Sequence, residues 1–298
     1  MSVEADSQVH LIDPVGPSPA SQDPITGLAL TNYSDQKTSA YETTPWGVQA
    51  VWNGKFNSST ASTLGSGKYA FVIDTGVSST TRDLNVDTQR GYNWINNTIT
   101  AEDDNGHGTH VAGTIGALAN NYGVVGVAPG TSIIPLKVLD SSGSGSLSTA
   151  ISAVNYAVKL INTVGSGISM ANSVANLSLG AQSSYKSLDT AIYNAAQSGL
   201  RFAIAAGNNG SDVDGFTPAR TGDNANVYTV SAVDNNYKMQ SWSNWDKLTS
   251  TDKIDNIDYA APGVNVLSLN NNYGYLSVMS GTSMASPHMA GLLLISDS

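Results

Sequence analysis

The segment YAFVIDTG, residues 69–76, decides the fold that we expect for this chain of 298 residues. Its first five residues are apolar or aromatic, which is typical of a short strand buried on both faces of a sheet. Asp74 follows directly, and Thr75 and Gly76 then form a turn. The pattern predicts a strand that carries a carboxylate at its carboxyl end, although a turn-forming or helix-capping aspartate is an equally good interpretation of Asp74 alone.

Strand-like and helix-like segments alternate after this point. Apolar residues recur at helical spacing through residues 148–164 and 188–198, and Gly199 ends the second stretch. This alternation predicts an α/β fold in three layers, with a mostly parallel central sheet and helices on both faces. The other strands are expected at residues 132–139, 175–179, 202–206 and 227–233.

Composition excludes several classes of partner and chemistry. Lys and Arg number 13 against 23 acidic residues, and the net charge of −10 disfavours nucleic acid or an anionic membrane as a partner. The absence of cysteine excludes disulfides, thiolate metal sites and a cysteine nucleophile. No apolar run reaches the roughly 18 residues of a membrane span, and the acidic first ten residues do not form a signal peptide.

His107 is the first candidate for chemistry beyond Asp74. It lies in NGHGTHVAG, residues 105–113, where flanking glycines leave space around the imidazole and a buried helix is expected to begin. A zinc site of His107, His110, Asp103 and Asp104 is an alternative, but the i, i+3 spacing without a glutamate is not the usual helical zinc motif. His110 is better explained as a core histidine.

Ser283 and Asn208 are the other candidates. Ser283, in GTSMASPH, follows a Gly-Thr turn and opens an apolar helix, whose N-terminal partial charge would stabilise an alkoxide. An ordinary N-cap serine is the alternative, and Ser286 before a proline also resembles a cap. Asn208 follows the strand at 202–206, so its amide could donate to a carbonyl oxygen that gains charge, unless it is a plain turn residue.

Together these segments resemble the subtilisin-like serine peptidases, or subtilases, from about Glu42 to the last residue. The order Asp, His, Ser is that of the family. The resemblance implies a serine endopeptidase, a hydrolase, in which Ser283 attacks the peptide carbonyl, His107 takes its proton and Asp74 orients the imidazole. Asn208 and the Ser283 backbone N–H would form the oxyanion hole. The matching motifs are VIDTG at 72–76, HGTHVAG at 107–113, AGN at 206–208 and GTSMA at 281–285.

The resemblance also implies a cleft that binds a polypeptide substrate as an extended strand. Gly215 and Phe216 are expected at the floor of the primary pocket, where the chain is similar to the proteinase K branch. The absence of an obvious charged residue there predicts apolar or aromatic P1 residues. The expected rims are Gly143, Ser144 and Gly145 on one side and Ser178, Leu179 and Gly180 on the other, and Ala205, Ala206 and Gly207 form the second pocket wall.

A structural calcium ion with oxygen ligands is a further implication of the resemblance. A surface loop without metal is the alternative, and a second site is expected at Asp258 with the carbonyls of Ala225 and Val227. The ligands expected for the first site are the side chains of Glu42, Asp83 and Asn120 and the carbonyls of Leu118, Tyr122 and Val124.

The ends of the chain depart from the family pattern. Residues 1–40, with the proline-rich segment 13–19, are expected to be an extension or linker, for example a pro-segment remnant. Residues 41–298 are expected to be the peptidase catalytic domain, truncated after the apolar helix end at 292–298, which would lack part of its cover. Residues 245–257 are expected to be an insertion.

Three functions stay open at this point. The first is a monomeric endopeptidase of broad specificity, located outside the cell or at its surface. The second is a dedicated precursor-processing or cyclising peptidase of the same family. The third is a catalytically silent scaffold that keeps the peptide-binding cleft, which is disfavoured because all the expected catalytic residues are present.

Overall fold

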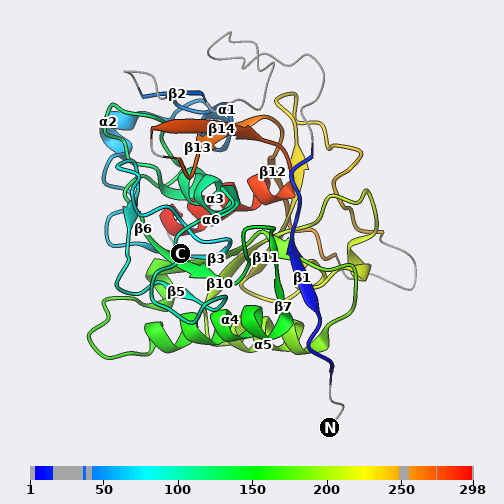
Figure 1. Cartoon of the computed structure of the whole chain (residues 1–298). Coiled ribbons are helices and arrows are strands. Elements are labelled where there is room, and N and C mark those ends of the chain that lie inside the picture. The colour runs from blue at the N-terminus through cyan, green and yellow to red at the C-terminus, as the bar shows by residue number, and fades with distance from the viewer. Residues whose placement is uncertain (1–3, 16–35, 38–41, 248–254, 273, 297–298) are drawn as a thin grey trace.

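A computed structural model describes residues 4–15, 36–37, 42–247, 255–272 and 274–296 (Figure 1). Most of the expected linker and the middle of the expected insertion lie outside these residues. Among the described helices, none has both the length and the apolar character that a membrane crossing requires.

An eight-stranded sheet forms the centre of the molecule, and all of its strand pairings are parallel. Its strands lie in the order β12-β11-β10-β8-β3-β6-β4, with β5 also paired to β6. The five strands expected from the sequence are all present, within a few residues of the expected bounds. The strands are β3 (Tyr69–Asp74), β4 (Asn85–Val86), β5 (Tyr92–Asn93), β6 (Ser132–Lys137), β8 (Ser173–Leu177), β10 (Arg201–Ala205), β11 (Val227–Val233) and β12 (Tyr259–Pro262).

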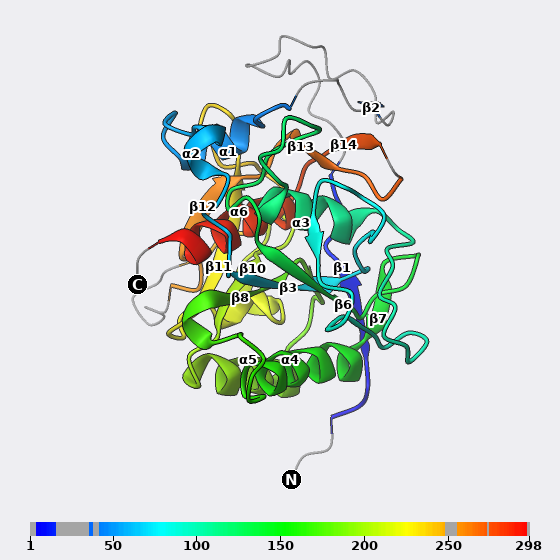
Figure 2. The same ribbon diagram turned by 90° about the vertical axis from the view of Figure 1, so that its left-hand side faces the viewer.

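Helices cover both faces of this sheet (Figure 2). Helices α4 (Leu147–Ile161) and α5 (Lys186–Gln197) lie on one face. Helices α3 (His107–Gly116) and α6 (Thr282–Ile295) lie on the other, with the short α1 (Trp46–Val51) nearby and α2 (Ser58–Ala61) further out. The three-layer α/β architecture predicted from the sequence is therefore confirmed.

Two hydrophobic cores follow from the alternation of side chains along each strand. In β3, Phe71 and Ile73 join the core under α4 and α5, whereas Ala70 and Val72 join the core under α3 and α6. The apolar end of α6 is better covered than the sequence suggested, because Leu293 and Leu294 are buried in the second core. Both faces of the central sheet are thus closed to water, and the open positions lie at its edges and strand ends.

Two smaller sheets complete the fold. The sheet β13-β14-β2 comprises Val266–Leu269, Tyr275–Met279 and Gln36–Lys37. The sheet β7-β1-β9 was not expected: β1 (Gln8–Leu11), from the predicted extension, lies between β7 (Ser144–Ser146) and β9 (Leu179–Gly180). Figures 1 and 2 both show β1 running beside β7.

Phe202 tests the packing of the core under α4 and α5. Its side chain in β10 is fully buried, so Phe202→Ala should lower the free energy of unfolding by about 3–5 kcal/mol. Tyr193→Ala on the exposed face of α5 is the control and should change it by less than about 0.5 kcal/mol. Urea denaturation gives both values, and equal losses would contradict this packing.

Candidate active site

Asp74 and His107 meet where β3 ends and α3 begins. The His107 Nδ1 atom lies 2.8 Å from Asp74 Oδ1, and both side chains are buried. Gly108 permits this approach, because a Cβ atom at that position would lie 2.0 Å from the Gly76 carbonyl oxygen. The sequence predicted this pair, and the structure brings its members together.

The electrostatics of the pair suit a group that accepts a proton. Burial by itself lowers the pKa of His107, but Asp74 beside it, with Asp103 and Asp13 further away, raises the pKa above its ordinary value. The Nε2 atom of His107 has no hydrogen-bond partner among the described residues. One nitrogen of the imidazole is therefore hydrogen-bonded to a carboxylate, and the other is available to accept a proton.

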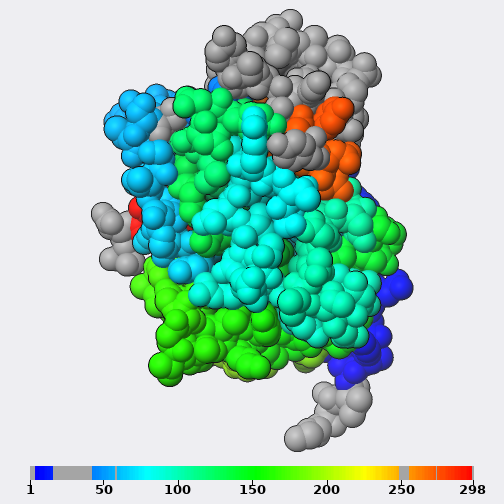
Figure 3. All heavy atoms as spheres, turned by 60° about the vertical axis from the view of Figure 1, so that its left-hand side comes forward, coloured from blue at the N-terminus to red at the C-terminus, as the bar shows by residue number. Residues whose placement is uncertain are grey.

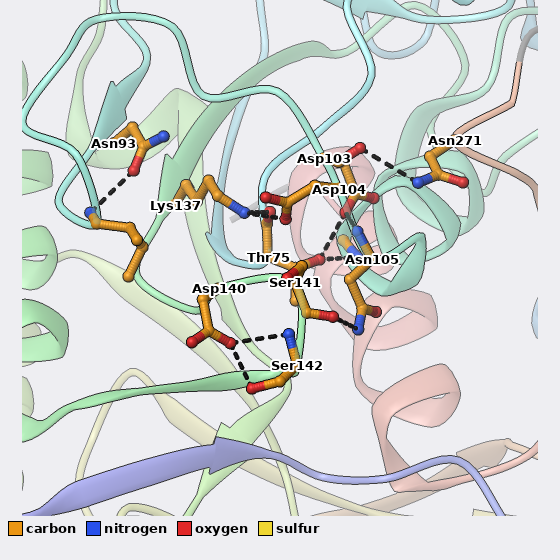
Figure 4. Close-up of polar contacts among 12 residues, drawn as sticks. Thr75, Asn93, Asp103, Asp104, Asn105, Lys137, Asp140, Ser141, Ser142 and Asn271 are labelled. Atoms are coloured by element: carbon orange, nitrogen blue, oxygen red, sulfur yellow. Dashed lines mark hydrogen bonds and ion pairs between the residues drawn. The ribbon is translucent and has the colours of Figure 1, made fainter.

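Asp103 organises the first turn of α3 (Figure 4). Its carboxylate accepts hydrogen bonds from the backbone N–H groups of Gly106 and Thr109, each at 2.9 Å, and from the Thr75 hydroxyl at 2.9 Å. Lys137 donates to the Thr75 carbonyl and, at 2.6 Å, to Asp104. Because Gly106 offers no side chain as a cap, Asp103 supplies the negative charge that favours a helix N-terminus.

The zinc alternative is wrong for these residues. His110 Nε2 lies 3.0 Å from the carbonyl oxygen of Val266, while Asp103 and Asp104 have the partners just described. Burial lowers the pKa of His110 to about 3, so the ring is neutral. His110 is therefore a core histidine, which is the interpretation that the sequence favoured.

Ser283 lies in the first turn of α6, as expected, with its side chain buried. Its hydroxyl donates to the carbonyl oxygen of Ile12 at 3.0 Å, and the carbonyl oxygen of Ser178 lies 3.4 Å away. No hydrogen bond joins Ser283 to His107 in this arrangement, because the N-terminal segment takes the hydroxyl. The serine–histidine bond of the expected mechanism stays a prediction.

A proline inside α6 determines how the backbone carbonyl of Ser283 is hydrogen-bonded. Pro287 has no N–H, so the carbonyl of Ser283, four residues earlier, lacks its helical partner. The Ser178 hydroxyl donates to that carbonyl at 3.1 Å. Asn176 donates to the Ser178 hydroxyl at 3.0 Å and accepts from Ser286 at 2.8 Å. Sequence reasoning missed Asn176, although an amide within an apolar strand is a signal of such a role.

Asn208 has a fixed side chain. Its Oδ1 atom accepts from the backbone N–H and the hydroxyl of Thr282, each at 2.9 Å. The Nδ2 group therefore points away from α6, and it donates to the carbonyl oxygen of Asp13 at 2.8 Å. Asn208 thus makes the type of contact that the sequence suggested, an amide donating to a carbonyl oxygen.

The expected substrate rims hold a strand of the chain itself. Strand β1 is antiparallel to both β7 and β9, with His10 opposite Ser144 on one side and Gly180 on the other. Two further bonds extend the pairing, from Leu11 N to Gly143 O at 2.8 Å and from Ile12 N to Ser178 O at 3.2 Å. The two segments expected as rims therefore lie on either side of a strand of the same chain, which the sequence did not predict, and their role in substrate binding stays a prediction.

A cavity of about 350 Å³ lies beside this strand. Its walls include Ala205–Gly207, the segment expected at the second pocket wall, together with Asn208, Asn209 and Phe216–Ala219. Apart from the N-terminal segment, none of the described residues that line it is charged. Gly215 is not among its lining residues, so of the two residues expected at the floor only Phe216 contributes.

The residues expected to bind calcium lie around one loop. Asn120 donates to the buried Asp83 carboxylate at 2.9 Å, and Glu42 accepts from the Asn120 backbone at 2.7 Å. Burial raises the pKa of Asp83 to about 7, and nearby Glu42 adds to the shift. Leu118, Tyr122 and Val124 also line this loop, through N–H groups that bond to Asp83 O, Asn120 Oδ1 and Asp83 Oδ2.

Two other acidic positions lie elsewhere in the fold. Asp258, expected at a second calcium site, accepts from Thr229 N at 2.8 Å, and burial raises its pKa to about 6. Sequence reasoning did not find the cluster of Asp212, Asp214 and Asp246, in which one oxygen of each carboxylate lies within 4.8 Å of the others. A bridge between Asp212 and Trp245 brings these distant segments together.

Comparison with known proteins identifies the class. Residues 65–296 match the Subtilase family, and the chain belongs to that family. Subtilisin Savinase from Lederbergia lenta is 38% identical over 250 residues, which cover 84% of this chain and 82% of that one. The crystal structure of a cold adapted subtilisin-like serine proteinase superposes with a TM-score of 0.68 at 34% identity, covering 84% of this chain and 83% of the other.

Other relatives are longer than this chain. Alkaline serine exoprotease A from Vibrio alginolyticus is 38% identical over 236 residues, which are 79% of this chain but 39% of that protein. A thermostable alkaline protease from Halalkalibacterium halodurans is matched over 62% of its length. The chain therefore spans less than two thirds of these curated relatives.

The role of Ser178 can be tested with a double-mutant cycle. Ser178→Ala should cost about 1–3 kcal/mol, because the buried Ser283 carbonyl loses its donor. In a Pro287→Ala background the cost should be smaller by about 1 kcal/mol, since the substituted residue regains an N–H for that carbonyl. Urea unfolding of the four proteins gives the coupling, and a coupling near zero would contradict the assignment.

Proposed function

We propose that this protein is a serine endopeptidase that hydrolyses polypeptides bound as extended strands. One observation carries the proposal: a strand lies between β7 and β9 with successive carbonyl oxygens on Ser283 and Asn208. Backbone pairing on both sides binds a chain without regard to its sequence, and the adjoining cavity receives a side chain.

The residues around that strand supply the groups that an acyl-transfer reaction requires. The Ser283 hydroxyl attacks the carbonyl carbon and its proton passes to His107 Nε2, while Asp74 stabilises the resulting imidazolium. Asn208 and the Ser283 N–H would bind the oxyanion. When the C–N bond breaks, His107 returns the proton to the leaving amine, and water then hydrolyses the acyl ester by the same route.

The choice among functions rests on the site as well. A silent scaffold is not favoured, because the buried Asp74–His107 pair is costly to desolvate and peptide binding alone does not require it. The uncharged cavity wall supports a preference for apolar or aromatic P1 residues. A dedicated processing role, a monomeric state and an extracellular or cell-surface location stay predictions that rest on the family resemblance.

A fluorophosphonate probe tests the nucleophile. The probe should label the protein, and Ser283→Ala should abolish both labelling and casein hydrolysis, whereas Ser59→Ala on the surface should change neither. Asn208→Ala should still be labelled but should lower kcat by about 10²–10³-fold, the loss known for this donor in subtilisin itself. Undiminished labelling of the Ser283→Ala protein would contradict the mechanism.

We also propose a structural calcium ion at the loop of Asp83. The main support for a cation at this site is the carboxylate of Asp83. Burial raises its pKa, even though the charge of Arg82 acts in the opposite direction. Glu42 and Asn120 lie beside it and offer the oxygen ligands that calcium prefers, once the Asn120 amide turns its oxygen toward the site. The ion would hold this loop to the start of the domain.

Thermal melting tests the calcium proposal. Chelator should lower Tm by about 5–10 °C, the effect of a ligand present at about a hundred times its Kd. Asp83→Asn should remove most of that difference, whereas Asp87→Asn, a carboxylate paired with Arg90, should keep it. Identical melting curves with calcium and with chelator would refute the site.

A further inference from the structure

A buried lysine lies on the strand next to Asp74. Lys137, the last residue of β6, is opposite Asp74 in the register of the two parallel strands, and 3% of its side chain is exposed. Its ammonium group donates to the carbonyl of Thr75 and, at 2.6 Å, to the carboxylate of Asp104 (Figure 4). We propose that Lys137 is a positioning residue for the base His107: it holds the end of β3 against the segment that leads into α3, and its charge offsets the surrounding carboxylates.

The burial of this lysine is unusual. Lysine is almost never fully buried unless it is paired, and its partner Asp104 keeps 56% of its side chain exposed. Figure 3 shows the segments between β3 and β6, in cyan and green, at the surface of the molecule. An ion pair at that surface would cost much less desolvation than one that takes the ammonium group out of water. The buried position of Lys137 instead places a positive charge at the end of β3.

Thr75 connects the ammonium group to the buried pair of Asp74 and His107. Its carbonyl accepts from Lys137, and its backbone N–H donates to Asp74 Oδ1 at 2.7 Å. Its hydroxyl accepts from the backbone N–H of Gly108, in the first turn of α3, at 3.0 Å. The same Asp74 oxygen lies 2.8 Å from His107 Nδ1. One residue therefore contacts the lysine, the carboxylate and the helix that carries the imidazole, so the lysine can act on His107 without touching it.

The charges around His107 are mostly negative. Strands β3, β6 and β13 and helix α6 pack against α3. The charged groups and histidines of these elements, of the loop before α3 and of the adjoining N-terminal segment are Asp13, Asp74, Glu102, Asp103, Asp104, His110, Lys137 and His288. The two other histidines are neutral, because burial lowers the pKa of His110 to about 3 and that of His288 to about 4. Lys137 is therefore the one cation in this set of described residues.

A base must be unprotonated at the pH at which it works. The carboxylates of Asp74, Asp103 and Asp13 all raise the pKa of His107 and so favour its protonated form. A positive charge in the same buried region acts in the opposite direction. The inference rests on the proposed peptidase function for its consequence, but the protonation of His107 can be measured whether or not the protein cuts peptides.

Titration of the histidines in the full-length protein is the first measurement. NMR of protein labelled at histidine Cε1 follows all four imidazoles, and His107→Gln identifies the signal of His107. Lys137→Met removes the charge and should raise the pKa of His107 by at least about 0.5. Lys137→Arg keeps the charge and should restore at least half of that change. Lys159→Met, on the exposed side of α4, is the matched control and should leave the pKa unchanged. An unchanged pKa in folded Lys137→Met would overturn the inference.

Asp104→Asn tests the charge without removing the lysine. This variant loses the negative partner of Lys137, so the pKa of His107 should fall, and Lys137→Met/Asp104→Asn should lie between the two single variants. A loosened structure would instead move the pKa in the same direction in both single variants, and that result would contradict the proposal. If Lys137→Met does not fold, Asp104→Asn decides alone, since its side chain is half exposed. An unchanged pKa there would then refute the role of this ion pair.

The pH dependence of fluorophosphonate labelling completes the test. The labelling rate should fall as His107 is protonated, and the pH of half-maximal rate should change in each variant in the same direction as the pKa measured by NMR. A half-maximal pH that stays constant while that pKa changes would show that Lys137 does not act on the reaction. The expected changes in pKa in a protein that is not labelled at any pH would support the action of Lys137 on His107 and refute the proposed catalysis.

Discussion

The buried contact between Asp74 and His107 is the interaction on which the rest of the cleft depends. Two polar groups removed from water must satisfy each other, and their separation of 2.8 Å leaves little freedom to the elements that carry them. Strand β3 therefore has to end at the first turn of α3. Asp103, through its bonds to Gly106 and Thr109, holds that turn in place.

The second half of the site is held by an irregular helix. Pro287 breaks the hydrogen-bond pattern of α6 one turn after Ser283, and the free carbonyl is satisfied from β8 and the residues that follow it, through Ser178 and Asn176. The nucleophile is thereby tied to the same sheet that carries Asp74. Since β3 and β8 are neighbouring parallel strands, one rigid support positions both halves of the site.

The sequence predicted what is local or carried by a motif. The strand β11 was placed at its observed bounds, residues 227–233, because the run VYTVSAV is short, mostly apolar and rich in β-branched residues, which is typical of a buried strand. The position of β1 could not be predicted in the same way. Its pairing partners lie more than 130 residues away, and nothing in the run 8–11 itself specifies them. The bridge between Asp212 and Trp245 is hidden for the same reason, because spatial proximity there depends on the completed fold.

The two edges that flank β1 explain how the N-terminal segment and a substrate can bind in the same cleft. Strands β7 and β9 expose backbone donors and acceptors that any extended chain can satisfy. When a substrate replaces β1, one set of backbone hydrogen bonds is exchanged for an equivalent set, so the backbone contributes little to the difference in free energy. The difference in free energy between the bound segment and a bound substrate then depends on their side chains and on the covalent link that joins the segment to the rest of the chain. The N-terminal segment is stabilised by the burial of Val9 and Leu11 and by the contacts of Glu4 with α5 and of Asp6 with α4. A substrate that displaces the segment must recover that free energy from the same subsites and from the uncharged cavity.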